Sequence, residues 1–184
     1  LAAKALAAGK ISGLLLAWKI QQAYQQAVAL DGKNIEARLS LLRYYLIVPS
    51  IAGGGIEKAQ ELAQETLAIH AQAAQLMRGA ISLREKQLAA AEAAVLSASA
   101  PGSPPLDETL TEMQRSLLIG TGSLYMEAKK YTDAERAFRT IQKYCPDSAW
   151  GPFLLARVKQ TQGKCSVALP FFEKAVALDS EAGY

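Results

Sequence analysis

Matching residues recur at a fixed interval of about 34 residues in the last third of the chain. Small and aromatic residues keep this interval at five positions: Gly122, Tyr131, Ala134, Phe138 and Ile141 correspond to Ala156, Cys165, Ala168, Phe172 and Ala175. A repeat of this length holds two helices and a turn, and such a unit cannot bury its apolar face alone. The spacing therefore predicts helix pairs that stack on one another.

Residue sizes at these positions suit two closely packed helices. Small residues such as Gly122 and Ala134 allow antiparallel helices to approach, and Phe138 fills the space beside that contact. Gly163 stands at the turn of the last unit. Pro146 follows the second helix of the unit before it, where a residue without an N–H ends a helix.

The period and the pattern of small and aromatic residues resemble the tetratricopeptide repeat (TPR) family. The resemblance implies an all-α fold, namely a right-handed α-solenoid of stacked antiparallel helix pairs, as a single domain over residues 1–184. It places a partial repeat at 1–31, repeats at about 34–70, 72–100, 114–147 and 148–181, and a proline-rich connection at 97–106. Composition agrees, because 51% of the residues are hydrophobic and alanine and leucine, both good helix formers, are abundant.

The extended turn at residues 48–55 ends in three glycines and, with its flanks, resembles a group of bacterial TPR proteins. Members of that group commonly enter the cell envelope through a signal peptide. This resemblance favours a periplasmic or exported location over a cytoplasmic one. It covers roughly residues 1–70 and implies no ligand.

Membrane insertion and nucleic-acid binding are not predicted. The longest apolar run, residues 13–18, is shorter than the ~20 residues that span a bilayer, and Lys10 and Lys19 bracket it. Net charge is only +3. Residues 1–50 hold six basic residues against two acidic ones, but without the recurring aromatics of a nucleic-acid platform.

The sequence predicts no enzyme, no metal site and no cofactor. His70 is the single histidine and has no cluster of ligands at metal-binding spacing, so a helix-end or capping role is expected. Glycines 53–55 lack the Gly-Lys-Ser/Thr of a phosphate loop and predict a turn with positive φ.

A helix is expected to begin just after the proline-rich connection. Either Asp107 with Leu110 or Thr109 with Glu112 forms its N-terminal capping pattern.

The two cysteines are predicted to be free thiols. Cys145 ends the second helix of one repeat, and Cys165 lies at the turn of the next, so helices about 20 Å long separate them. A disulfide requires Cα atoms within about 7 Å. Cys165 is expected to be a small packing residue.

The TPR resemblance also implies a binding groove, because the first helix of each repeat lines the concave face in that family. Carried over by position, the lining is mainly apolar and aromatic: Leu41, Tyr44, Tyr45, Leu76, Leu83, Arg84, Ile119, Met126, Trp150, Phe153 and Arg157, with Ala37, Ala80 and Ser123 between them. The asparagine and lysine pair with which chaperone-binding members clamp a terminal carboxylate is absent. The expected ligand is therefore an apolar peptide or an amphipathic helix.

The predicted function is a noncatalytic protein–protein interaction scaffold whose protein or peptide partner is unidentified. Two alternatives stay open: a self-associating structural module, and an accessory subunit of a bacterial envelope or secretion assembly. Burial between repeats is the competing prediction for Trp150 and Phe153.

Overall fold

The computed structural model describes the backbone of residues 2–181 and the side chains of residues 13–179. Within this part of the chain the secondary structure is nine α-helices and one short 3-10 helix, with no strand: α1 (Ala2–Leu30), α2 (Ile35–Ile47), η1 (Ser50–Ala52), α3 (Ile56–Leu67), α4 (Ala71–Arg84), α5 (Leu88–Ala98), α6 (Glu108–Glu127), α7 (Tyr131–Tyr144), α8 (Trp150–Thr161) and α9 (Cys165–Glu181).

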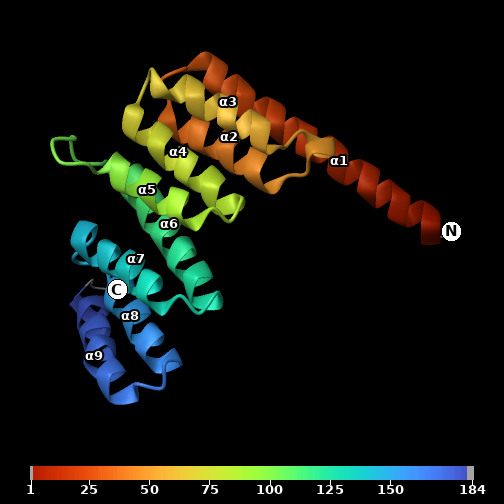
Figure 1. The fold of residues 1–184 in the computed structure, drawn as a ribbon. Coiled ribbons are helices and arrows are strands. Elements are labelled where there is room, and N and C mark those ends of the chain that lie inside the picture. The colour runs from red at the N-terminus through yellow and green to blue at the C-terminus, as the bar shows by residue number, and fades with distance from the viewer. Residues whose placement is uncertain (1, 182–184) are drawn as a thin grey trace.

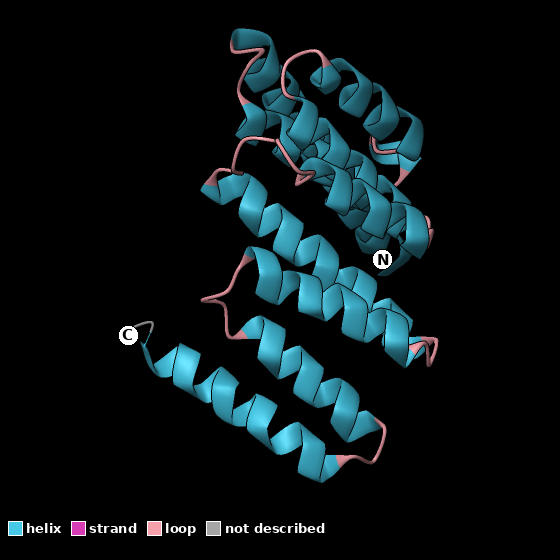
Figure 2. Cartoon of the chain, turned by 60° about the vertical axis from the view of Figure 1, so that its left-hand side comes forward, coloured by secondary structure: helices cyan, strands magenta, loops and turns pink. Residues whose placement is uncertain are grey.

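Consecutive helices pack against one another, so the chain forms a right-handed solenoid of antiparallel helix pairs (Figures 1 and 2). The α4–α5, α6–α7 and α8–α9 pairs have the most extensive contacts. The amino-terminal part of α1 extends away from the other helices, at the opposite end of the molecule from α9 (Figure 1). None of the helices within residues 2–181 combines the length and apolar character needed to cross a bilayer. The predicted all-α solenoid is confirmed.

The turns inside three helix pairs share one geometry, in which a residue with positive φ follows the first helix. Lys86 (φ 60°), Lys129 (φ 58°) and Gly163 (φ 75°) hold this position in the α4–α5, α6–α7 and α8–α9 turns. In each turn the next N–H donates to the carbonyl five residues back, for example Lys130 to Tyr125 at 2.8 Å. This is the Schellman arrangement that ends a helix. The repeat interval, which separates Lys129 from Gly163, therefore appears in the backbone itself.

Polar side chains cap the first helix of three pairs. Asn34 accepts a hydrogen bond from the N–H of Ala37, the Nδ1 atom of His70 accepts one from Ala73, and Asp107 accepts one from Leu110. Each bond satisfies an N–H that has no partner inside the helix. The predicted capping role of His70 is confirmed, and Asp107 is the N-cap of α6.

The glycine-rich turn between α2 and α3 depends on positive φ and close backbone approach. Gly53 and Gly55 have φ of 95° and 135°, and a Cβ on Gly54 would lie 1.7 Å from the carbonyl oxygen of Val48. Lys58 donates to the carbonyl oxygen of Gly53 at 2.9 Å. The turn is therefore a structural connection, as predicted.

The proline-rich connection between α5 and α6 is exposed but anchored at both ends. The Nε2 atom of Gln72 donates to the carbonyl oxygens of Ala98 and Pro104, at 2.9 and 2.8 Å. Gln114, which is buried, donates to the hydroxyl of Ser99 at 2.7 Å. Helix α6 contacts both α4 and α5. Packing is thus continuous across the connection.

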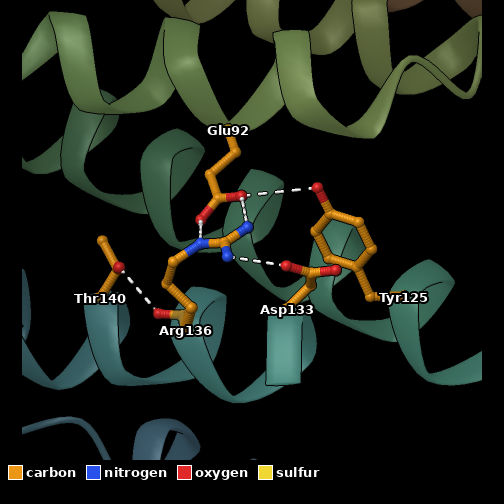
Figure 3. A network of polar contacts seen from close by, with 5 residues as sticks. All are labelled: Glu92, Tyr125, Asp133, Arg136 and Thr140. Carbon is orange, nitrogen blue, oxygen red and sulfur yellow. Dashed lines mark hydrogen bonds and ion pairs between the residues drawn. The ribbon is translucent and has the colours of Figure 1, made fainter. Parts of the chain in front are cut away.

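An ion pair also bridges this connection (Figure 3). The carboxylate of Glu92 on α5 is buried and receives two hydrogen bonds of 2.8 Å from Arg136 on α7. Arg136 also donates to Asp133 at 2.7 Å, and the Tyr125 hydroxyl donates to Glu92 at 3.5 Å. Burial, and then the nearby Glu92 carboxylate, raises the pKa of Tyr125, so its hydroxyl remains a donor. Three helices, α5, α6 and α7, are joined at this point.

Replacing Arg136 by alanine should lower the free energy of unfolding by about 1–3 kcal/mol, because the Glu92 carboxylate would stay buried without its cation. The double variant Glu92→Met/Arg136→Ala should recover part of the loss, since an apolar side chain needs no partner. Chemical denaturation measures both values.

Arg139→Ala is the matched control. Arg139 pairs with Glu135, which keeps a second partner in Lys159, so the loss should stay below about 1 kcal/mol. Equal losses for Arg136→Ala and Arg139→Ala would show that the Glu92 pair does not stabilise the junction.

The helices of the α6–α7 pair meet where the sequence pattern predicts. Gly122, Ala134 and Phe138 are all buried, and a Cβ on Gly122 would lie 2.2 Å from the Phe138 ring. Gly79 of α4 is less crowded, because its Cβ would lie 3.3 Å from the Cδ1 atom of Leu117 on α6 and at an ordinary contact distance, 3.5 Å, from the carbonyl oxygen of Ala91 on α5. The close approach of α6 and α7 therefore requires a residue without a side chain at Gly122.

Gly122→Ala should destabilise the protein by about 1–3 kcal/mol, because the added methyl overlaps a rigid aromatic ring that is itself fully buried. The thermal midpoint should fall accordingly. Gly13→Ala is the control, since nothing lies within 4 Å of its Cβ and an alanine favours the helix. A thermal midpoint for Gly122→Ala at or above that of the parent protein would contradict the proposed packing of α6 on α7.

Candidate functional site

Four of the predicted groove residues are buried in the core. Leu41 and Leu76 are almost inaccessible, and only 7% and 6% of Tyr44 and Tyr45 is exposed. The Tyr44 hydroxyl donates to the carbonyl oxygen of Ala52 at 2.5 Å and lies 2.9 Å from that of Ala17 on α1. Burial, and then the neighbouring Tyr45, raises the pKa of Tyr44.

Helix α1 covers the two tyrosines. The Tyr24 ring of α1 meets the Tyr44 ring edge-on, with centroids 6.5 Å apart, and the side chain of Gln25 donates to the Tyr45 hydroxyl at 3.3 Å. The expectation that Tyr44 and Tyr45 face a groove instead of a neighbouring helix is therefore wrong. Both tyrosines hold α1 on α2.

A second group of predicted residues is half-buried on α4 and α6. Leu83, Ile119 and Met126 pack against the core while keeping part of each side chain accessible. The end of Leu83 lies against Gly120 of α6, where a Cβ would approach it to 2.8 Å. Arg84 is exposed, and its Nε atom donates to the carbonyl oxygen of Leu46 at 2.9 Å. These side chains are accessible in part, but none of them projects a large apolar area.

All three predicted residues on α8 are exposed. Trp150 is 47% exposed, Phe153 is 36% exposed, and Arg157 is also exposed. The Trp150 and Phe153 rings pack edge to face with centroids 6.0 Å apart, and Phe153 packs in the same way, at the same distance, on Phe172 of α9. We refer to Trp150, Phe153 and Phe172 as the α8–α9 aromatic cluster. Complete burial of Trp150 and Phe153 is thereby excluded in this structure.

Sequence reasoning missed the apolar surface of α9. Leu169 and Val176 are exposed, with Val176 at 68%, and they flank Phe172 at spacings of three and four residues on one face of the helix. The sequence contained a signal for this surface, because Leu169 and Val176 replace the polar residues Glu135 and Gln142 that stand at the matching positions one repeat earlier.

Two surface hollows lie elsewhere on the described part of the molecule. Leu41 and Tyr45 contribute to a hollow of about 330 Å³ between α1, α2 and α3. A larger one of about 790 Å³ between α3 and α4 is lined mainly by charged and amide side chains, including Arg78 and Glu85. Among the described residues, no group of three His, Cys, Asp or Glu side chains is arranged to hold a metal ion.

The two cysteines are free, as predicted, but differ in environment. Cys145 is half-buried, and its burial raises the pKa of its thiol. Cys165 is exposed at the first turn of α9, one turn before Leu169. The expectation that Cys165 is a packing residue is wrong, because none of the described helices covers its side chain.

A thiol reagent should modify Cys165 roughly tenfold faster than Cys145 at neutral pH, because the thiolate is the reacting species and burial disfavours it at Cys145. Raising the pH should narrow the difference. Absorbance of the released chromophore, with Cys145→Ser and Cys165→Ser to assign the phases, measures both rates. Faster reaction at Cys145 would contradict the burial assigned to it.

Comparison with known proteins supports the fold alone. No protein-family model matches the sequence, and no curated protein matches it. The structure is similar to a crystal structure of MamA, with 18% identity, a TM-score of 0.55, and coverage of 89% of this chain and 90% of that one. A second MamA structure, from MSR-1, gives 16% identity, a TM-score of 0.53, and coverage of 91% and 94%. Similarity at this identity shows a common helical-repeat, TPR-like fold.

Proposed function

We propose that this protein is a noncatalytic interaction scaffold that binds the apolar face of a peptide or amphipathic helix along α4, α6 and α8. The observation that carries the proposal is the exposed aromatic pair of α8. Trp150 and Phe153 lie at positions that line the groove in the TPR arrangement. About half of the Trp150 surface and about a third of the Phe153 surface are exposed. Exposed aromatic side chains of this kind are typical anchors at protein interfaces.

Other accessible side chains at the expected groove positions favour an amphipathic ligand. Half-buried Leu83, Ile119 and Met126 continue the apolar lining on α4 and α6. Exposed Arg84 and Arg157, at groove positions of α4 and α8, favour acidic residues on the polar side of the ligand. A helix with apolar residues at positions i, i+3 or i+4 and i+7 fits this combination. The buried residues Leu41, Tyr44, Tyr45 and Leu76 are not part of the proposed surface.

Selection from a displayed library of random peptides should enrich sequences with apolar residues at helical spacing and acidic residues between them. Trp150→Ala/Phe153→Ala should weaken binding of the selected peptides by a factor of about 5–1000, corresponding to roughly 1–4 kcal/mol for interface anchors. Fluorescence anisotropy of labelled peptides gives the dissociation constants.

The matched control is Ile69→Ala/Leu96→Ala, because both residues are exposed and apolar but lie outside α4, α6 and α8. Its affinity should stay within about threefold of the parent value. Circular dichroism should show unchanged helix content for all variants. Enrichment of polar peptides, or equal affinity of the aromatic variant and the parent protein, would refute the proposed binding surface.

A further inference from the structure

We call the surface of α9 that carries Leu169, Phe172 and Val176 the α9 stripe. It corresponds to a surface of α7 that forms an interface with the next helix inside the solenoid. One pair earlier, α7 receives α8 on the corresponding surface. Glu135 of α7 pairs with Lys159 of α8, and a Cβ on Gly151 of α8 would lie 2.5 Å from the Cγ atom of Gln142. This surface of a second helix is therefore the one on which the next helix of the solenoid packs.

The counterparts of these contact residues on α9 are apolar and open. Leu169 stands one repeat after Glu135, and Val176 stands one repeat after Gln142. Both are exposed, and Phe172 between them is half-buried, whereas its counterpart Phe138 is completely buried. The ion-pairing Glu135 and the amide of Gln142 on α7 thus correspond to aliphatic side chains on α9, which favour packing against an apolar helix.

The opposite end of the molecule presents an apolar helix. Within residues 13–20 of α1, all residues except Lys19 are apolar, and the exposed side chains point to different sides of the helix: Leu15, Leu16, Trp18 and Ile20. Trp18 is 46% exposed. A helix that is apolar on all sides is normally buried, yet α2 is the only helix that α1 contacts extensively among the described residues. The remaining faces of this segment lack a covering element among the described residues.

Charge separates the two ends in a complementary way. Residues 2–30 contain three lysines and no acidic residue, a formal charge of +3, whereas residues 165–181 contain three acidic residues and one lysine, a formal charge of −2. Two copies of α1 would repel each other, and so would two copies of α9. A pairing of α1 with α9 brings opposite charges together beside two apolar surfaces.

We infer that α1 of one copy docks on the α9 stripe of a second copy, so that this protein associates with itself from head to tail. The contact joins two different surfaces, and each added copy leaves one free α1 and one free α9 stripe. Association therefore continues beyond a dimer. This inference concerns the ends of the solenoid and stands independently of the peptide-binding surface proposed above.

Sedimentation velocity of the purified full chain tests the inference with no other protein present. The average mass should rise with concentration and pass that of a dimer, and higher salt should reduce it. A head variant, Leu16→Glu/Trp18→Glu, changes α1 on sides about 200° apart, and a tail variant, Leu169→Glu/Val176→Glu, changes the α9 stripe. Each should associate at least about tenfold more weakly, because a carboxylate must then enter an apolar contact.

An equimolar mixture of the two variants distinguishes this arrangement from other forms of self-association. The head variant keeps an intact α9 stripe and the tail variant keeps an intact α1, so the mixture should form a one-to-one dimer and no larger species. Leu96→Glu, a change at an exposed apolar residue in the middle of the solenoid, should associate like the parent protein. Variants with glutamine in place of glutamate serve if a charged variant loses helix content.

Three results would overturn the inference. The first is a parent protein that stays monomeric at high micromolar concentration. The second is association of the head variant alone at the parent level, which would indicate contact between two α9 surfaces. The third is a mixture that contains only monomers although both variants are folded.

Discussion

The buried carboxylate of Glu92 requires a cation, and Arg136 supplies it from a helix that lies 44 residues further along the chain. The pair holds α5 to α7 across the irregular proline-rich connection, where no short turn sets the distance between successive helix pairs. The pKa of Arg136 is raised, mainly by its hydrogen bonds to Glu92, so the ion pair stays charged. In a solenoid each unit contacts only its neighbours, so the relative placement of the two halves depends on junctions such as this one.

The same one-dimensional arrangement accounts for accessible apolar surface on the first and last of the described helices. Every internal helix is covered by the helices before and after it, while the first and last of the described helices each have one uncovered side. Leu16 and Trp18 at one end and Val176 at the other are exposed, and Phe172 is half-buried whereas its internal counterpart Phe138 is completely buried. If copies associate through these ends, the binding surfaces proposed above are linked in one assembly, and a partner with several binding segments gains avidity.

The accessibility expected for the candidate site residues is found on α8 but not on α2. Trp150, Phe153 and Arg157 are exposed on the structure, in agreement with a groove position, and their role in binding stays a prediction. The TPR resemblance assigns Tyr44 and Tyr45 to the same concave face, yet α1 packs over them. A carry-over by position identifies which face of a helix a residue lies on. It does not identify what covers that face, because the covering helix comes from another part of the chain.

The sequence alone determined the local structure. The small residue Gly122 and the cap at His70 depend on neighbours within one helix pair. Their spacing and size, together with the repeat interval, therefore suffice to predict helices, turns and the solenoid. Tertiary structure decided the accessibility of each position. Phe138 and Phe172 share one register position, but α8 packs beside the first and none of the described helices packs beside the second in the same way. Burial depends on distant segments of the chain, and a periodic pattern repeats residue types without specifying which copies of the pattern lie at an end.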